Sequence, residues 1–271
     1  MTEPNAGTNA FRIETIAKKD GDAYRITGSK TFITGADVAD RMLLVCRTTS
    51  REDVVRMGLP KPFGMALFVV DPKSPGITLT PIPTRGIEGM RQFTVFFDDV
   101  VVPAEELVGQ PDAGAFVMFN SLNPERILAA ATACGMARYC LGKAVSYANE
   151  RKVFGDRPIG AYQGISHPLA RVKMELEAAR LMTYRAAWAF DADKSPGEVG
   201  AAANAAKYLA TEMAIAAVDR AIQTHGGYGF SEDYGIIWFW EAVRLLRTAP
   251  ITAEMILNYV AEHELGLPRG Y

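Results

Sequence analysis

Hydrophobic and polar residues alternate with a period of two through much of the first hundred positions, which is the pattern of half-buried strands. Residues 11–15 follow this alternation and predict a first strand. Asp20-Gly21 predicts a hairpin turn, and the stretch 24–27 predicts the return strand. Further short apolar runs predict strands at 42–46, 65–70, 77–80 and 93–97. Because Pro and Gly separate these runs, we expect a closed or stacked antiparallel sheet up to about Val102.

The hydrophobic period changes to that of helices in the second half of the chain. A first helix is expected from Gly114 to Glu150, with Pro124 kinking or restarting it. Three more helices are expected at 162–190, 198–223 and 234–263. Long helices joined by short loops pack as antiparallel neighbours. The pattern therefore predicts an α+β multidomain chain, with an antiparallel β-barrel-like domain at 1–110 and an up-and-down four-helix bundle at 111–271.

The composition is that of a chain with a packed core. Hydrophobic residues make up 49% and charged residues 22%, and the formal net charge of −2 disfavours nucleic-acid binding held by charge alone. The sequence shows no signal-peptide pattern and no apolar run long enough to cross a membrane. Cys46, Cys134 and Cys140 lack metal-ligand spacing, so we expect reduced core thiols in a cytoplasmic protein.

Most familiar catalytic motifs are missing from the sequence. It contains no phosphate loop, no zinc-ligand spacing and no Gly-x-Gly-x-x-Gly. Of the three histidines, His225 beside a Gly pair is the one near a candidate site, which gives a Ser-His-Asp hydrolase little support. A lone histidine beside a helix end is more often a capping or packing residue.

Glu125 is the only acid between Asp112 and Glu150, and an Ala-rich, almost uncharged helical stretch follows it. Two interpretations remain open from the residues alone. A carboxylate in a first helical turn is stabilised by the unpaired N–H groups there. Alternatively, an acid beside so apolar a stretch is a candidate general base.

Four motifs stand in a fixed order along the chain. They are Thr2–Asn9 with Thr31–Thr34, Glu150–Gly155 with Gln163, Gln223–Gly229, and Glu241–Arg247 with Thr252 and Glu254. Together they resemble the flavin-dependent acyl-CoA dehydrogenases across essentially the whole chain. The resemblance implies a β-barrel middle domain followed by a four-helix bundle, in a homotetramer or dimer. It also implies an acyl-CoA substrate, FAD between the two domains with its ADP end at a neighbouring subunit, and an electron-transfer flavoprotein or similar acceptor.

The resemblance also assigns roles to individual residues. FAD contacts fall on Thr8, Phe32, Thr34, Arg151, Phe154, Gln223, Gly226, Gly227, Thr252 and Glu254. Thr8 is in addition a substrate contact, and Arg126 lies near the acyl-CoA. A pyrophosphate needs a cation and close backbone approach, which Arg151 and a Gly-Gly turn can supply. Taken without the resemblance, Arg151 is a solvated helix-end charge and the Gly pair is a helix C-cap.

One departure from the family pattern concerns the catalytic base. The usual base is a Glu on the last helix, where this chain aligns Pro250, which cannot take a proton. Members resembling isovaleryl-CoA and long-chain acyl-CoA dehydrogenases instead carry the base on the first bundle helix, directly before an Arg, as in Glu125-Arg126. The resemblance thus assigns α-proton abstraction to Glu125, with the β-hydride passing to flavin N5. Pro250 also lacks the N–H that normally polarises the thioester carbonyl. Ala249, Ile251 and a flavin ribityl hydroxyl remain alternative donors.

A second departure lies at the start of the chain, where family members carry a helical domain before the Thr-Glu-Pro motif. We expect a truncated or split form, whose isolated chain would bind FAD weakly because one wall of the acyl pocket would be open. Two alternatives to a dehydrogenase remain. One is an acyl-CoA oxidase or a flavin monooxygenase-like relative, and the other is a non-catalytic oligomeric remnant.

Overall fold

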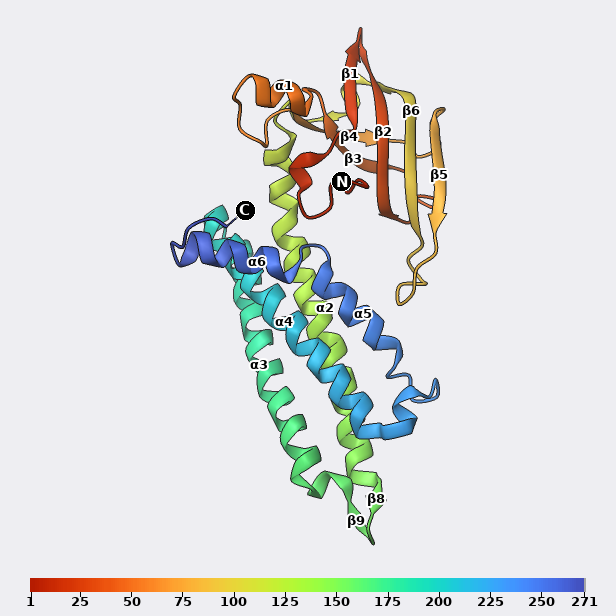
Figure 1. Cartoon of the computed structure of the whole chain (residues 1–271), viewed down its shortest axis with the longest axis vertical. Coiled ribbons are helices and arrows are strands. Elements are labelled where there is room, and N and C mark those ends of the chain that lie inside the picture. The colour runs from red at the N-terminus through yellow and green to blue at the C-terminus, as the bar shows by residue number, and fades with distance from the viewer. Residues whose placement is uncertain (271) are drawn as a thin grey trace. The chain divides into compact units, whose positions relative to one another are not determined.

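The computed structural model describes residues 1–270, apart from the side chains of residues 119 and 120. They divide into two compact units, Met1–Ser121 and Leu122–Tyr271, which are described separately as the β unit and the helical unit (Figure 1). The division falls within the long helix α2 (Gly114–Glu150).

One seven-stranded sheet forms the β unit. Its strands are β1 (Ile16–Asp20), β2 (Ala23–Thr34), β3 (Met42–Arg47), β4 (Met65–Val70), β5 (Ile77–Ile82), β6 (Gln92–Pro103) and β7 (Leu107–Val108), in the order β5-β6-β2-β1-β3-β4-β7. Neighbouring strands pair antiparallel, except that β1 and β3 meet in parallel at Ile16 and Arg47. The sheet is therefore mixed, since β3 joins the far side of β1 and runs in the same direction.

The predicted hairpin is confirmed, because β1 and β2 pair in register from Ile16 with Thr27 to Asp20 with Ala23. Gly21 in the two-residue turn has φ of 58°, a conformation that glycine adopts without a steric penalty. The other predicted strands lie within β3, β4, β5 and β6. The short helix α1 (Arg51–Arg56) was not predicted, and the Ser50 hydroxyl caps it by accepting from the Asp53 N–H at 3.1 Å.

The predicted strand at 11–15 is wrong. Residues Ala10–Arg12 form a 3₁₀ turn instead. The guanidinium of the buried Arg47 donates to the carbonyls of Phe11 at 2.7 Å and Ile13 at 2.9 Å, so these carbonyls cannot join a strand ladder. The alternation that suggested a strand therefore reflects which side chains are buried and not how the backbone pairs.

Five helices form most of the helical unit. They are α2, α3 (Gln163–Asp191), α4 (Pro196–His225), α5 (Trp238–Thr248) and α6 (Ala253–Tyr259), with a hairpin of β8 (Lys152–Val153) and β9 (Arg157–Pro158) between α2 and α3. Further short turns lie at Ile159–Ala161 and Gly226–Phe230, and a π-helical turn at Val260–Glu264, while the turn at Ala104–Glu106 belongs to the β unit. The core of this unit is rich in alanine, which lets helices approach closely. The expected class, a β domain followed by a helical bundle, is confirmed.

Two predictions about proline positions need correction. Helix α2 is continuous through Pro124, so the predicted restart is wrong. Proline removes one intrahelical hydrogen bond, and burial of the alanine face that follows keeps the helix whole. The single helix predicted at 234–263 is instead broken, because Pro250 has no N–H with which to continue α5. Thr252 then starts α6, its hydroxyl accepting from the Met255 N–H at 3.3 Å.

Candidate active site

Glu125 lies near the start of the α2 segment that belongs to the helical unit. Its side chain is exposed, yet the surrounding protein removes enough water to raise the pKa of its carboxyl above the ordinary value. The neighbouring positive charge of Arg126 acts in the opposite direction. A carboxyl with a raised pKa and an accessible side chain is suited to accept a proton from a ligand.

Arg126 ties α2 to α4. Its Nη1 donates to Asn204 Oδ1 at 2.5 Å, its Nη2 to Asn123 Oδ1 at 2.8 Å, and its Nε to the Leu122 carbonyl at 3.1 Å. Burial lowers the pKa of this guanidinium. All three nitrogens of Arg126 thus have partners inside the helical unit, so its most evident role here is to hold Glu125 and its helix against α4.

Lys207, also on α4, holds the turn at residues 249–252. Its side chain is fully buried, and its ammonium donates to the carbonyls of Ile251 at 2.6 Å and Arg247 at 3.3 Å. Residues three apart on a helix share a face, so Asn204 and Lys207 bring the Glu125 turn and the Pro250 turn to the same side of α4. We call this group of residues, Glu125, Arg126, Asn204, Lys207 and the turn 249–252, the base region.

Sequence reasoning missed both Asn204 and Lys207. A signal was present, because Lys207 is the only charged residue between Glu198 and Glu212, in a run that is otherwise mostly alanine. A lone lysine in an apolar helix face is rarely buried unless partners receive its protons.

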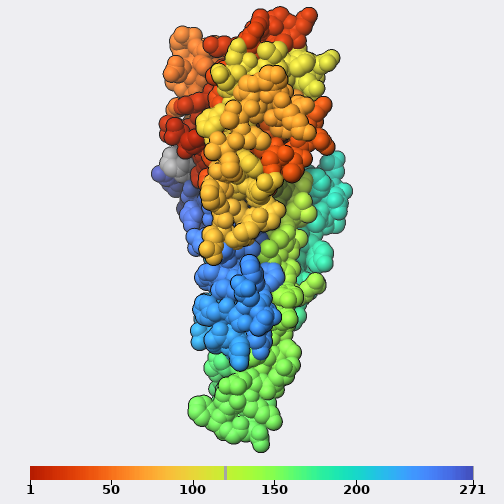
Figure 2. Space-filling view, turned by 90° about the vertical axis from the view of Figure 1, so that its right-hand side faces the viewer, coloured from red at the N-terminus to blue at the C-terminus, as the bar shows by residue number. Residues whose placement is uncertain are grey.

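Arg151 and Phe154 lie at the opposite end of α2, where the β8–β9 hairpin projects from the bundle (Figures 1 and 2). Phe154 is 96% exposed and has φ of 49°, which is unusual for a bulky residue. Arg151 is exposed, while its backbone is fixed by bonds to the Tyr147 carbonyl and the Ile159 N–H, both at 2.8 Å. The hairpin therefore presents a cation and an uncovered aromatic ring on an ordered backbone.

The Gly226-Gly227 turn lies at this same end of the helical unit. Gly226 has φ of 60°, and no neighbouring atom lies within 4 Å of where a side chain would begin at either glycine. Buried His225 stacks on Tyr147 of α2 with ring centroids 4.3 Å apart, which joins the end of α4 to the end of α2. We call Arg151, Phe154, Gln223 and the Gly226-Gly227 turn the hairpin end, and its open backbone suits close approach by a flat or phosphate-bearing ligand.

The β unit holds the remaining predicted residues. Thr8 is exposed in a loop whose base is fixed by Glu3, which accepts from the N–H groups of Glu14 at 2.7 Å and Thr15 at 3.1 Å. Glu3 also forms a buried ion pair with Lys30 at 2.6 Å. Sequence reasoning missed this pair, although both residues lie next to motif positions.

Phe32 and Thr34 lie at the end of β2, beside the Thr8 loop, because the Thr31 N–H donates to the Thr2 carbonyl at 2.9 Å. Phe32 has φ of 55° and is 59% exposed, at a point where the pairing of β2 with β6 is irregular. The Thr34 hydroxyl lies within 3.1 Å of the buried Gln92 amide. The end of β2 therefore presents an exposed ring beside a hydrogen-bonded hydroxyl.

The predicted residues thus form three groups: the base region with Thr252 and Glu254, the hairpin end, and the Thr8–Phe32–Thr34 group. The first two are joined by one helix, along which Glu125 and Glu150 are roughly 38 Å apart at about 1.5 Å per residue. The base region and the hairpin end therefore lie at well-separated points along the helical unit.

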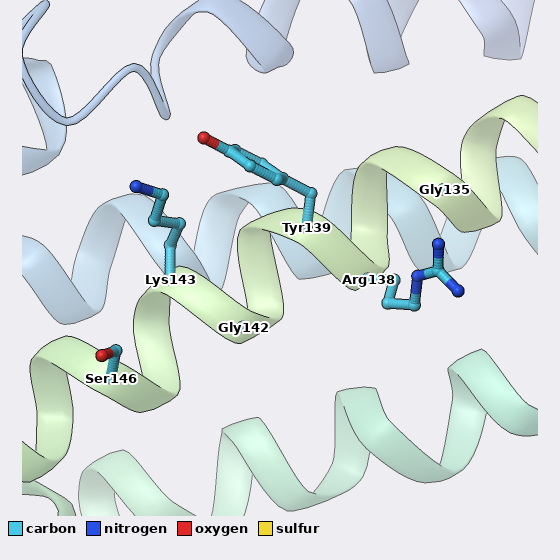
Figure 3. Close-up of a pocket in the computed structure, with 6 residues that line it drawn as sticks. All are labelled: Gly135, Arg138, Tyr139, Gly142, Lys143 and Ser146. Carbon is cyan, nitrogen blue, oxygen red and sulfur yellow. The ribbon is translucent and has the colours of Figure 1, made fainter.

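A separate groove of about 410 Å³ runs along α2, lined by Gly135, Arg138, Tyr139, Gly142, Lys143 and Ser146 (Figure 3). Tyr139 packs against Phe239 of α5, and the Lys143 ammonium lies 5.6 Å from the Tyr139 ring. None of the predicted site residues lines this groove. Within residues 1–270, no cluster of His, Cys, Asp and Glu could hold a metal ion, and no helix is both long and apolar enough to span a membrane.

Comparison with known proteins assigns this architecture. Residues 1–100 match the acyl-CoA dehydrogenase middle domain, and residues 112–265 match the acyl-CoA dehydrogenase C-terminal domain. The chain belongs to the acyl-CoA dehydrogenase family. It is 46% identical to the acyl-CoA dehydrogenase FadE12 of Mycobacterium tuberculosis, covering all of this chain and 68% of that protein.

Solved structures with the same fold include a butyryl-CoA dehydrogenase and PigA. The butyryl-CoA dehydrogenase of Megasphaera elsdenii superposes with a TM-score of 0.89 at 33% identity, over 97% of this chain and 66% of that one. The structure of PigA with FAD and proline superposes with a TM-score of 0.91 at 27% identity, over 99% and 67%. The chain spans about two thirds of the length of these relatives. Membership of an FAD-dependent acyl-CoA dehydrogenase family is thereby confirmed.

Proposed function

We propose that this chain carries out FAD-dependent α,β-dehydrogenation of an acyl-CoA thioester, with Glu125 as the general base. The observation that carries the proposal is that the chain has a carboxylate at position 125 and a proline at position 250, where the family's usual base would stand. Position 250 holds no proton acceptor, while Asn204 and Lys207 hold the Glu125 helix and the Pro250 turn to one face of α4. In this proposal the Glu125 carboxylate on α2 takes over the role of the family's usual base on the last helix.

The chemistry requires a base whose proton affinity rises as water leaves the site. Partial desolvation already raises the pKa of Glu125, and a bound acyl chain would remove more water. Arg126 keeps its own charge beside the carboxyl and fixes the helix through Asn204, and we propose that it lies near the acyl-CoA. FAD, when bound, accepts the β-hydrogen as a hydride.

The residues of this chain fit FAD at the three groups described above. We propose that Thr8, Phe32 and Thr34 contact the flavin, with Thr8 also near the substrate, and that Thr252 and Glu254 are further FAD contacts. Arg151, Phe154, Gln223, Gly226 and Gly227 contact the ADP part. Helix α2 keeps the base region and the hairpin end of one chain well apart, and we propose that the hairpin end contacts the FAD of a second copy in a homo-oligomer, either a dimer or a tetramer.

The functional domains are proposed to divide between residues 110 and 111, as a middle domain and a bundle domain. The matched family ranges, which end at 100 and begin at 112, support this boundary. An electron-transfer flavoprotein or a similar acceptor would reoxidise the flavin, and we propose a cytoplasmic location.

An Arg151→Ala variant is expected to bind FAD about 10- to 100-fold more weakly and to assemble less well. Loss of one charge-assisted hydrogen bond to a pyrophosphate accounts for an effect of this size. Flavin retention after gel filtration, together with the mass of the assembly by light scattering, measures both effects at one salt and protein concentration.

Arg157→Ala is the matched control for this experiment. It removes an exposed arginine from the same hairpin, one whose guanidinium lies over Tyr162 and outside the proposed contacts. Equal FAD affinity for Arg151→Ala and the parent protein would reject the role of Arg151.

The proposed reaction is tested by adding acyl-CoA of several lengths to the purified protein with an electron-acceptor dye. A dehydrogenase is expected to reduce the dye in proportion to substrate and to consume little oxygen without it. Rapid oxygen consumption in the absence of dye would identify an oxidase or monooxygenase-like relative. A colourless protein with an intact assembly would identify a non-catalytic oligomeric remnant.

A further inference from the structure

Lys207 is unusual because it is a fully buried cation whose hydrogen-bond partners are backbone carbonyls. The Ile251 carbonyl accepts at 2.6 Å and the Arg247 carbonyl at 3.3 Å. Among the described residues, no carboxylate lies within ion-pair distance of the Lys207 ammonium. Burying a charge is unfavourable, so a lysine kept in this position needs a reason beyond general packing.

The two carbonyls lie on either side of Pro250, at a point where the helical hydrogen-bond pattern ends. Arg247 lies in the last turn of α5, where carbonyls have no intrahelical N–H partner. Pro250 contributes no N–H to the turn that follows. An ammonium at this point satisfies the free carbonyls and lies at the negative end of the α5 dipole.

We infer that Lys207 is a positioning residue that fixes the 249–252 turn against α4, and with it Thr252 and Glu254 at the start of α6. Asn204 lies three residues earlier on α4 and holds Arg126, so the same helix face also sets Glu125. Helix α4 thereby fixes the spacing between the base and the turn. The roles of Glu125, Thr252 and Glu254 in this inference rest on the proposed function.

The charges around Lys207 come from three helices. Glu212 on α4 and Glu254 on α6 favour its charged form, while Arg247 on α5, itself paired with Glu212 at 2.5 Å, opposes it. Burial is the largest effect and lowers the pKa of Lys207 to about 8. Because this value is below the ordinary 10.5, the charged lysine opposes folding fully below pH 8, and the opposition fades as pH rises from 8 to 10.5.

Because the buried charge of Lys207 opposes folding, a positioning residue and a residue that only supports the fold should respond differently to substitution. Replacing Lys207 by an apolar side chain of similar length should free the turn without lowering the overall stability, since a buried charge is removed at the same time. A residue that only supports the fold would instead lower the unfolding midpoint when replaced.

The experiment compares hydrogen exchange of the amides in residues 248–256 in the parent protein, Lys207→Met and Lys207→Gln. Loss of a charge-assisted bond predicts exchange about tenfold faster in Lys207→Met, with Lys207→Gln between the two because its amide still donates. Amides of α3 should keep the parent rate, and the unfolding midpoint should stay near that of the parent. Flavin retention should fall in the same order.

Lys173→Met on α3 serves as the control, because it removes an exposed lysine paired with Glu177. Parent exchange rates at 248–256 in Lys207→Met would overturn the inference. Faster exchange throughout both Lys207 variants, with a lowered midpoint, would also overturn it in favour of general support of the fold. The exchange measurement decides the inference even if the parent protein binds no FAD, an outcome that would reject only the proposed function.

Discussion

Glu125→Gln is expected to fold and to bind FAD as the parent protein does, while its turnover on acyl-CoA is lowered by about 10²- to 10⁴-fold, the usual effect of removing one general base. The amide matches the carboxyl in size and leaves the bonds from Arg126 to Asn204, Asn123 and Leu122 untouched. Since the folded protein already raises the pKa of Glu125, a neutral side chain at this position should not lower the unfolding midpoint.

Rapid mixing with acyl-CoA, followed by flavin absorbance, measures the proton-abstraction step separately from binding. Glu175→Gln is the matched control, because it makes the same change at a half-buried glutamate of α3 that pairs with Arg171. Normal turnover by Glu125→Gln would show that the base is another carboxylate and that the substitution at Pro250 has a different compensation.

Lys30→Met is expected to destabilise the β unit by about 3–5 kcal/mol, the range for stranding one partner of a buried ion pair. The side chains of Lys30 and Glu3 are 2% and 8% exposed, and their charged atoms lie 2.6 Å apart. Without Lys30, the Glu3 carboxylate would keep its bonds to the N–H groups of Glu14 and Thr15 and lose its counter-charge. The loop that carries Thr8 should then loosen.

The two partners respond differently to burial. Burial alone would raise the pKa of Glu3, but the charge of Lys30 and the hydrogen bonds to Glu3 bring that pKa below its ordinary 4.5. Burial lowers the pKa of Lys30 by more than Glu3 raises it. The pair as a whole therefore adds little net stability. The part due to Glu3 is present above pH 4.5 and is lost as pH falls through its lower folded pKa.

Calorimetry and hydrogen exchange of residues 2–34 would measure the loss in Lys30→Met. Lys18→Met, which alters an exposed lysine of β1, should behave as the parent protein. The double variant Glu3→Gln with Lys30→Met should regain much of the stability, because no unpaired charge is left. Equal stability of Lys30→Met and Lys18→Met would show that hydrogen bonds from backbone N–H groups are enough to stabilise the buried Glu3 carboxylate.

The sequence predicted the elements whose pattern is local. The Asp20-Gly21 turn signal and the return strand at 24–27 were placed correctly, and helical spacing placed α2, α3 and α4 close to their observed limits. The predicted strand was wrong where a side chain distant in sequence forms hydrogen bonds with the backbone carbonyls. Arg47 takes carbonyls that a strand over 11–15 would need, and no pattern within that stretch could reveal it.

The site residues also divide into those that local sequence motifs predicted and those that depend on contacts between distant segments. Motifs pointed to residues that lie in ordered, accessible positions, such as Phe32, Phe154 and the Gly226-Gly227 turn. The residues that fix the Thr8 loop and the 249–252 turn were not recognised, because Glu3, Lys30 and Lys207 act through buried contacts between segments far apart in sequence. The roles of these three residues depend on which atoms they contact in the folded protein, and a sequence pattern does not show those contacts.

Helix α2 carries Glu125 near one end and delivers the chain to Arg151 just beyond the other. Because the helix is continuous, it fixes the angular phase of these two residues as well as their separation. Deleting one residue between positions 126 and 150 would turn one end relative to the other by about 100°, since an α-helix has 3.6 residues per turn. Insertions and deletions should therefore be tolerated in the loops of this chain and selected against in this segment of α2. A change in its length would rotate Glu125 relative to the hairpin, so that the two would face different neighbours.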